Sequence, residues 1–199
     1  MRDSEPAGFW PAIRADFSRF REEGPGLRPL LRGLLSQGFQ ALLIYRVFRW
    51  FYEHGIPTQP VRFMFERFIE ITTGISIPAE AAIGKGLRIH HFGGIIIHPE
   101  AVIGEECTLY HGVTIGDLAV RRGAPQIGNG VLIGAGAKVI GAIRIGDDTL
   151  IGANAVVVSS VPSGYVAVGV PAVARPREKR KQFKSECSFT KAQSSQELQ

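Results

Sequence analysis

The chain has 199 residues, of which 45% are hydrophobic and 21% are charged, and its formal net charge is +5. This length and apolar content allow one well-cored domain with an appendage. The charge is only moderately basic, and since no nucleic-acid-reading module accompanies it, we expect no binding to DNA or RNA. The two cysteines, Cys107 and Cys187, lie in unlike surroundings, an apolar repeat and a polar tail. The sequence therefore predicts a reduced, cytoplasmic protein without a disulfide.

Residues 1–72 have a helical pattern. Apolar residues recur at spacings of three and four from Leu30 to His54, which predicts one long amphipathic helix. A second helix is expected from Pro60 to about Ile71, closed by Gly74. The longest apolar stretch, Phe39 to Tyr52, contains two arginines, so we expect no membrane-spanning segment there.

The same helical region is rich in aromatic residues and contains interspersed arginines, namely Arg46, Arg49, Arg62 and Arg67. This composition fits a cap over the open end of an adjoining domain or an oligomer interface. It also fits contact with a membrane surface, where aromatic and basic side chains suit the headgroup zone. We favour the cap or interface, with contact to the inner face of the membrane as the alternative.

A six-residue period of branched aliphatic residues follows the helical region. A period of six fits neither an amphipathic helix nor an alternating strand, and it predicts a parallel β-helix of short stacked strands. We expect this domain to span 73–175, followed by a basic and then polar, disordered tail at 176–199. The aliphatic residues expected in the interior column are Ile77, Ile83, Ile89, Ile95, Ile97, Ile103, Leu109, Ile115, Ile127, Ile133, Val139, Ile145, Ile151 and Val157.

The period is irregular at two places. It shifts by two residues at the run His-Phe-Gly-Gly, residues 91–94, and it is interrupted between Ile115 and Ile127. Arg121 would occupy the interior position in that gap, and a charged side chain is untenable there. We therefore expect 117–125 to leave the coil as a loop, and loops on a rigid scaffold concentrate binding residues.

Four of the five histidines, His90, His91, His98 and His111, lie close together in the repeat. A histidine at a coil edge beside glycines is well placed as a general base, although a solvent-facing turn histidine fits the same pattern. Successive coils could also bring His91 and His111 together as metal ligands. Neither a carboxylate nor a cysteine follows at ligand spacing, so we expect no metal.

Several runs of the repeat resemble the hexapeptide-repeat acyltransferases, and among them the serine acetyltransferase branch. The runs are residues 87–94 (Leu-Arg-Ile-His-His-Phe-Gly-Gly), 110–116 (Tyr-His-Gly-Val-Thr-Ile-Gly), 133–141 (Ile-Gly-Ala-Gly-Ala-Lys-Val-Ile-Gly) and 168–172 (Val-Gly-Val-Pro-Ala). The resemblance implies a mainly β fold, a left-handed parallel β-helix with an N-terminal α-helical region. It also implies a homotrimer that binds acetyl-CoA in the grooves between subunits.

The resemblance assigns catalysis to His91, which would take the proton from an acceptor hydroxyl while that oxygen attacks the thioester. A nearby backbone N–H would hold the oxyanion. The residues expected to contact the coenzyme are Gly116, Ala135, Lys138 and Ala153, with the basic segment 175–180 as a further candidate for its phosphates. The weaker candidates for contacting the acceptor are His90, His111, Arg121 and Arg122.

The acceptor-binding positions depart from the serine acetyltransferase pattern. Ser76 stands where those enzymes carry the aspartate that orients the histidine, His90 replaces a second aspartate, and the loop has Gly-Ala at 123–124 instead of Arg-His. Free serine is zwitterionic and calls for paired charges, whereas a sugar hydroxyl does not. The sequence therefore favours an acetyl-CoA-dependent O-acetyltransferase acting on a sugar of a bacterial surface polysaccharide or exopolysaccharide. Serine O-acetyltransferase is the alternative, and a non-catalytic β-helix scaffold is an alternative of another class.

Overall fold

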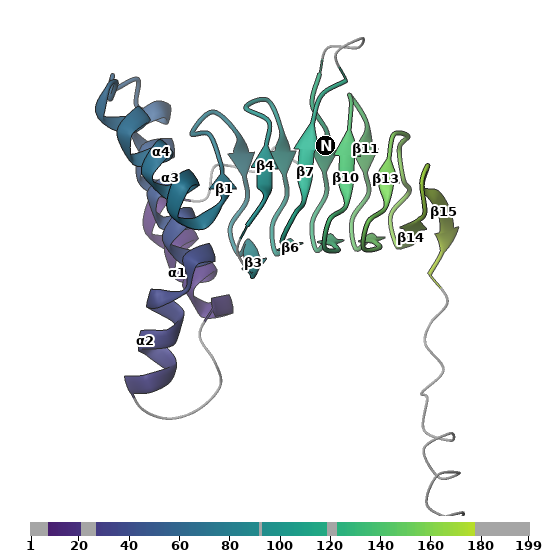
Figure 1. Cartoon of the computed structure of the whole chain (residues 1–199), viewed down its shortest axis with the longest axis horizontal. Coiled ribbons are helices and arrows are strands. Elements are labelled where there is room, and N and C mark those ends of the chain that lie inside the picture. The colour runs from purple at the N-terminus through teal and green to yellow at the C-terminus, as the bar shows by residue number, and fades with distance from the viewer. Residues whose placement is uncertain (1–7, 21–26, 92, 119–122, 178–199) are drawn as a thin grey trace, which may run out of the picture.

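The structure, a computed structural model, describes residues 8–20, 27–91, 93–118 and 123–177. Its described part is a column of short parallel strands with helices at one end (Figure 1). This architecture confirms the predicted left-handed parallel β-helix with an N-terminal helical region. Of the predicted tail, residues 178–199 lie outside the described part of the chain.

Four helices precede the strands in the described part of the chain. They are α1 (Phe9–Phe20), α2 (Leu27–Leu35), α3 (Gln37–Glu53) and α4 (Val61–Thr73). The second predicted helix is confirmed as α4, which ends at Gly74 in the left-handed conformation (φ 65°). The prediction of a single long helix from Leu30 to His54 is wrong, because the chain breaks between α2 and α3.

Ser36 makes that break. Its backbone is extended (φ −67°, ψ 130°), and its side chain accepts a hydrogen bond from the Phe39 N–H as the N-cap of α3. The new helix direction presses Gly38 against the first coil, where an added Cβ would lie 2.9 Å from the Cβ of Ile89. Docking onto the β-helix therefore sets where α3 begins.

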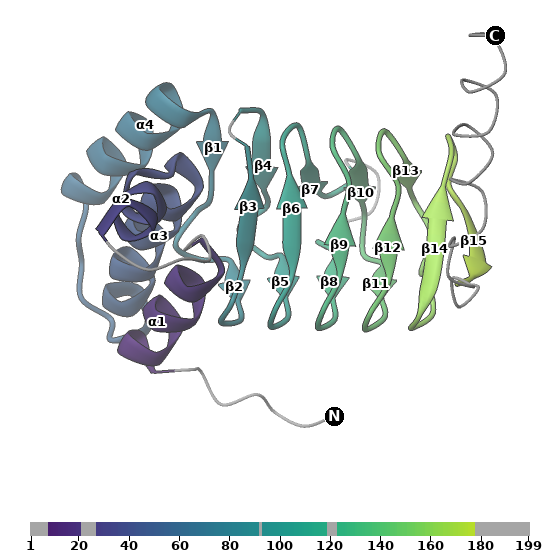
Figure 2. The same ribbon diagram turned by 90° about the horizontal axis from the view of Figure 1, so that it is seen from below.

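The strands form three sheets, which are the three sides of the column (Figure 2). Sheet A contains β1 (Ile75–Ser76), β4 (Ile95–Ile97), β7 (Thr114–Gly116), β10 (Lys138–Ile140) and β13 (Val156–Val157). Sheet B contains β2 (Ala82–Ile83), β5 (Val102–Ile103), β8 (Gln126–Ile127) and β11 (Arg144–Ile145). Sheet C contains β3 (Arg88–His90), β6 (Thr108–Tyr110), β9 (Leu132–Ile133), β12 (Leu150–Ile151), β14 (Tyr165–Val168) and the antiparallel β15 (Val173–Pro176).

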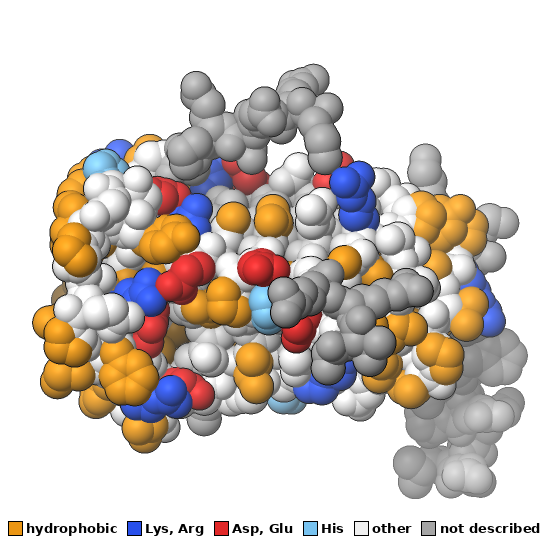
Figure 3. Space-filling view, turned by 90° about the horizontal axis from the view of Figure 1, so that it is seen from above, with side chains coloured by type: hydrophobic (Ala, Val, Ile, Leu, Met, Phe, Trp, Pro, Cys, Tyr) orange, Lys and Arg blue, Asp and Glu red, His pale blue; other side chains and the backbone are white. Residues whose placement is uncertain are grey.

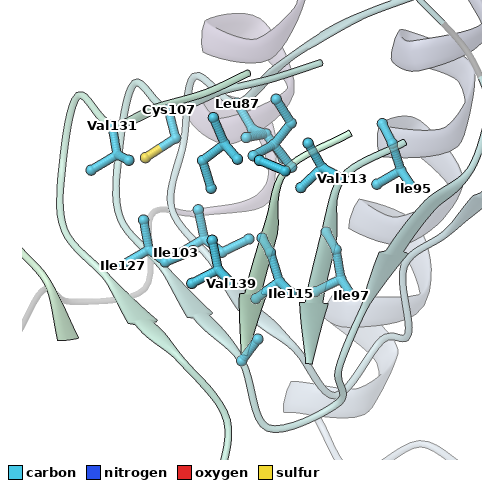
Figure 4. Packing of buried hydrophobic residues seen from close by; sticks show 14 of the residues in the cluster. Leu87, Ile95, Ile97, Ile103, Cys107, Val113, Ile115, Ile127, Val131 and Val139 are labelled. Carbon is cyan, nitrogen blue, oxygen red and sulfur yellow. The ribbon is translucent and has the colours of Figure 1, made fainter. Parts of the chain in front are cut away.

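The core is the predicted aliphatic column. All of the aliphatic residues predicted for the interior are buried, and those of neighbouring coils lie side by side inside the prism (Figure 4). Cys107 packs in the same core as a free thiol, and burial raises its pKa to about 11. The six-residue period thus identifies the inward-facing side chains directly.

The two irregularities change the length of a coil. Ser76 pairs with Ile96, and Ile96 in turn pairs with Thr114, so the first coil is longer by two positions than the second. The shift at 91–94 accounts for this difference. Ile115 pairs with Val139, a wider separation than in either preceding coil, which confirms that the chain leaves the coil between β7 and β8. Residues 119–122 of that loop lie outside the described part.

The helices lie against the first coil. The Tyr45 hydroxyl donates to the Ala81 carbonyl at 2.7 Å, and the Arg46 guanidinium donates to two carbonyl oxygens of the next turn, at 83 and 84. Arg46 is buried, so it is not available to a membrane surface. Exposed hydrophobic side chains nevertheless gather at the helical end (Figure 3), several of them on α4. No helix in the described ranges is long and apolar enough to cross a bilayer.

Candidate active site

The candidate residues meet at the edge where sheet C passes into sheet A, which we call the histidine corner. His90 pairs with Tyr110, and β6, β9 and β12 continue in register along sheet C. The residues that follow these strands therefore meet at the same corner on successive coils. From the helical end outward, they are His91, His111, Ala135 and Ala153.

His91 is exposed and adopts a left-handed backbone conformation (φ 61°). Residues other than glycine seldom adopt this conformation, and it occurs here in the turn that holds the two extra residues of the first coil. The His91 ring lies 5.8 Å from the His111 ring and 6.3 Å from the His90 ring, measured between centroids. Within the described residues, no hydrogen bond or ion pair engages the His91 ring, so its nitrogens are open to a ligand.

Glycines follow His91 in the turn. Gly93 (φ 103°) and Gly94 (φ 67°) have positive φ, and the Gly93 carbonyl accepts a hydrogen bond from the Gly112 N–H at 2.8 Å. A Cβ at Gly94 would lie 3.3 Å from the Gly112 Cα, so successive coils approach closely here. The N–H groups of Gly93 and Gly94 donate to no residue in the described ranges. Free backbone donors beside a histidine base can stabilise an oxyanion.

His90 points to a different neighbour. Its ring stacks on the Tyr110 ring, with centroids 4.8 Å apart and planes 13° apart. Burial lowers the pKa of His90, and electrostatic interactions with Arg88, His91 and Arg19 lower it further. The neutral imidazole is therefore favoured. Sequence reasoning missed Tyr110, although the two-residue shift implied that position 110 would pair with position 90.

Lys138 supports the turn that carries His111. Its ammonium donates to the Gly112 carbonyl at 2.6 Å and to the Thr114 hydroxyl at 2.9 Å. Its contact with coenzyme phosphate stays a prediction, and such a contact would have to share the ammonium with this turn.

The structure does not bring all of the predicted coenzyme contacts together within one chain. Ala135 and Ala153 lie at the histidine corner, whereas Gly116 ends β7 at the opposite edge of sheet A, where its carbonyl accepts from the Gly141 N–H. Arg175 is exposed on β15, and the rest of the basic segment from residue 178 lies outside the described ranges. Arg121 and Arg122 also lie outside the described residues.

Two further observations bear on the chemistry. A cavity of about 220 Å³ lies between α3, α4 and the first coils, and its lining includes Glu66 and Ser76 but no histidine. An exposed histidine that no described residue engages by a hydrogen bond is the stronger indication of a reacting centre, so the histidine corner and not this cavity is the candidate active site. No group of three or more His, Cys, Asp or Glu side chains able to hold a metal occurs among the described residues.

Comparison with known proteins gives consistent matches. The family model "Bacterial transferase hexapeptide (six repeats)" matches residues 124–159. The serine acetyltransferase of Helicobacter pylori strain J99 is 44% identical over 144 residues, which are 70% of this chain and 81% of that protein. The chain spans 45% and 65% of the length of two cyanobacterial serine acetyltransferases, from Synechococcus elongatus and Synechocystis.

The solved structures that resemble this chain are also serine acetyltransferases. Neisseria gonorrhoeae serine acetyltransferase in complex with serine has a TM-score of 0.74 and 34% identity, covering 83% of this chain and 68% of that one. Brucella abortus serine acetyltransferase in complex with coenzyme A has a TM-score of 0.75 and 30% identity, covering 83% and 67%. The repeat, the helical end and these extended similarities agree, and the chain belongs to the serine acetyltransferase family of hexapeptide-repeat transferases.

Proposed function

We propose that the chain transfers the acetyl group of acetyl-CoA to the hydroxyl of L-serine, with His91 as the general base. The observation that carries this proposal is an exposed His91 whose ring no described residue engages by a hydrogen bond. It lies in a turn whose Gly93 and Gly94 N–H groups donate to no described residue. The relatives support serine as the acceptor, since the compared proteins are named serine acetyltransferases and one holds serine. This support favours the alternative drawn from the sequence over the sugar acceptor.

The geometry fits a direct transfer. His91 takes the hydroxyl proton while the oxygen attacks the thioester carbonyl, and a new C–O bond forms. The N–H groups of Gly93 and Gly94 are available to the oxyanion that develops on the carbonyl. When the C–S bond breaks, the proton held by His91 passes to the departing sulfur. The products are O-acetylserine and CoA with a free thiol.

The histidine corner also supports the placement of acetyl-CoA. Ala135 and Ala153 follow His111 on successive coils of the histidine corner, and small side chains allow the pantetheine arm to approach the backbone. The similar structure of the Brucella abortus serine acetyltransferase is a complex with coenzyme A. Since Gly116 lies at the opposite edge of sheet A, a coenzyme that contacts both edges has to lie between two copies of the chain. Coenzyme contacts shared between two copies of the chain support a homotrimer with its sites between subunits.

A sugar hydroxyl is the second candidate acceptor. The observation that favours it is the absence, within the described ranges, of any carboxylate paired with His90 or His91, while Ser76 stands where the resemblance expects the orienting aspartate. The ammonium group of free serine calls for a carboxylate partner. Residues outside the described ranges, or on another copy of the chain, would have to supply it if serine is the acceptor.

The test is release of free thiol from acetyl-CoA by the purified full chain, with and without L-serine. We expect serine-dependent release that falls by about two to four orders of magnitude in His91→Ala, the usual weight of a general base. Coenzyme binding without serine-dependent release would reject serine and direct the assay to sugars. Absence of acetyl-CoA binding would reject both acceptors and leave the non-catalytic scaffold.

A further inference from the structure

We propose that His111 is a positioning residue for His91, so that the base is oriented by a second imidazole instead of a carboxylate. This inference rests on the proposed function, because it assumes that His91 accepts the acceptor proton. It assigns to His111 a role other than the acceptor contact expected from the sequence.

The geometry of the pair comes from the coil length. Gly93 is the coil equivalent of His111, since the Gly112 N–H donates to the Gly93 carbonyl as the Gly136 N–H donates to that of His111. His91 precedes it in the longer turn of the first coil and lies beside His111, with ring centroids 5.8 Å apart and planes at 75°. Nearly perpendicular rings at this separation bring the edge of one toward the face of the other. A direct contact or a single bridging water can then fix the ring of His91.

Hydrogen bonds hold the backbone of the turn that carries His111. Its carbonyl accepts from the Gly136 N–H at 2.8 Å, and the next residue, Gly112, is in the left-handed conformation (φ 72°). The Lys138 ammonium donates to the Gly112 carbonyl at 2.6 Å from within sheet A. The turn is therefore tied to the coils on both sides, and a fixed turn is what a residue needs in order to orient another side chain.

No carboxylate competes for this role among the described residues. Ser76 lies on β1 in register with Ile96, and it lines the cavity beneath the helices. A base whose second ring nitrogen has no partner can adopt either tautomer and several orientations. Within the described ranges, the only aromatic rings paired with the His91 ring are those of His90 and His111, and His90 is stacked on Tyr110.

Protonation of either ring would disable the orienting contact. The titratable and charged groups around this corner include His90, which stacks on Tyr110 and interacts with Arg88 and Arg19, and Lys138, which donates to the Gly112 carbonyl. The reactive form is the one with both rings neutral, because a protonated His111 can no longer accept a hydrogen bond from His91.

Three substitutions separate orientation from packing. His111→Phe keeps an aromatic ring in the T-shaped contact but removes both nitrogens, His111→Gln keeps hydrogen-bonding groups, and His111→Ala removes both features. We expect kcat to fall by about 10- to 100-fold in His111→Phe and His111→Ala, the usual effect of losing an orienting partner. His111→Gln should recover much of this loss, and the Kd for acetyl-CoA should be unchanged in all three.

The pH dependence provides the second readout. In the wild-type chain, log kcat/KM should fall with decreasing pH with a slope that steepens from about one toward two, since either of two protons inactivates the pair. In His111→Gln the slope should remain about one. Wild-type activity in His111→Phe, or the same steepening in His111→Gln, would overturn the inference. If His91→Ala retained wild-type turnover, the proposed function itself would fail, which distinguishes the two outcomes.

Discussion

A buried ion pair between Asp16 of α1 and Arg46 of α3 joins the helices to the first coil. The Arg46 guanidinium donates to the Asp16 carboxylate at 2.8 and 3.3 Å, and the two side chains, Arg46 and Asp16, are 7% and 1% exposed. The same carboxylate accepts from the N–H groups of Gly86 and Leu87, at 2.8 and 3.0 Å. Replacing Asp16 by Ala therefore leaves a buried guanidinium and two backbone donors without this partner.

The expected destabilisation is large. Removing one partner of a buried pair costs about 3–5 kcal/mol, because the remaining charge stays out of water. Arg46 keeps its hydrogen bonds to the carbonyls of Ile83 and Gly84, so the loss should lie toward the lower end of that range. With an m-value of about 2–3 kcal/mol per M, this corresponds to a fall of about 1–2 M in the urea midpoint.

Urea unfolding followed by far-ultraviolet circular dichroism measures this change. Lys85→Ala is the matched control, because the Lys85–Glu105 pair joins the first two coils at 3.4 Å but is 43% and 38% exposed. Exposed pairs contribute about 1 kcal/mol or less, so the control should unfold near the wild-type midpoint. An Asp16→Ala midpoint equal to that of the control would refute the argument that this pair holds the helices on the β-helix.

Three other variants test the described contacts. Gly112→Ala should destabilise the fold by about 1–3 kcal/mol in urea, and by more than Gly55→Ala, because both positions have positive φ but only Gly112 has the next coil 3.3 Å from the new Cβ. Since burial raises the pKa of the Cys107 thiol to about 11, a Cys187→Ser chain should not react with Ellman's reagent at pH 8 until denaturant is added; rapid labelling of the native chain would contradict this. Because the pKa of His90 is lowered from 6.5, the unfolded chain binds more protons than the folded chain near pH 6, so stability should fall as the pH drops through this range. His90→Gln should weaken that dependence when midpoints are compared at pH 5.5 and 7.5, and an unchanged dependence would show that other groups cause it.

The column of the β-helix was predictable because its period encodes the inward-facing side chains directly. Ile89, Leu109 and Ile133 stand in successive coils of sheet C, and each is buried as the repeat requires. The proximity of His91 to His111 could also be predicted from the sequence. It follows from the pairing of His90 with Tyr110, after which both chains enter the same corner.

The helical end was harder to predict, because its details depend on docking. The apolar spacing of α2 and α3 is nearly continuous, and the break at Ser36 arises where Gly38 meets the first coil. Arg46 resembles a surface residue in the sequence, yet its guanidinium is buried by partners that lie far away in the chain, on α1 and in the first coil. Local pattern carries no information about such pairs.

The central claim is transfer of acetyl from acetyl-CoA to a hydroxyl by His91. The most direct measurement is a reaction of the full chain with acetyl-13C-labelled acetyl-CoA and L-serine at neutral pH, followed by NMR detection of the ester carbonyl. We predict that labelled O-acetylserine forms with the wild-type chain and that its rate falls by about two to four orders of magnitude in His91→Ala. Equal rates for the two chains, or labelled coenzyme that binds and stays intact with serine present, would contradict the account.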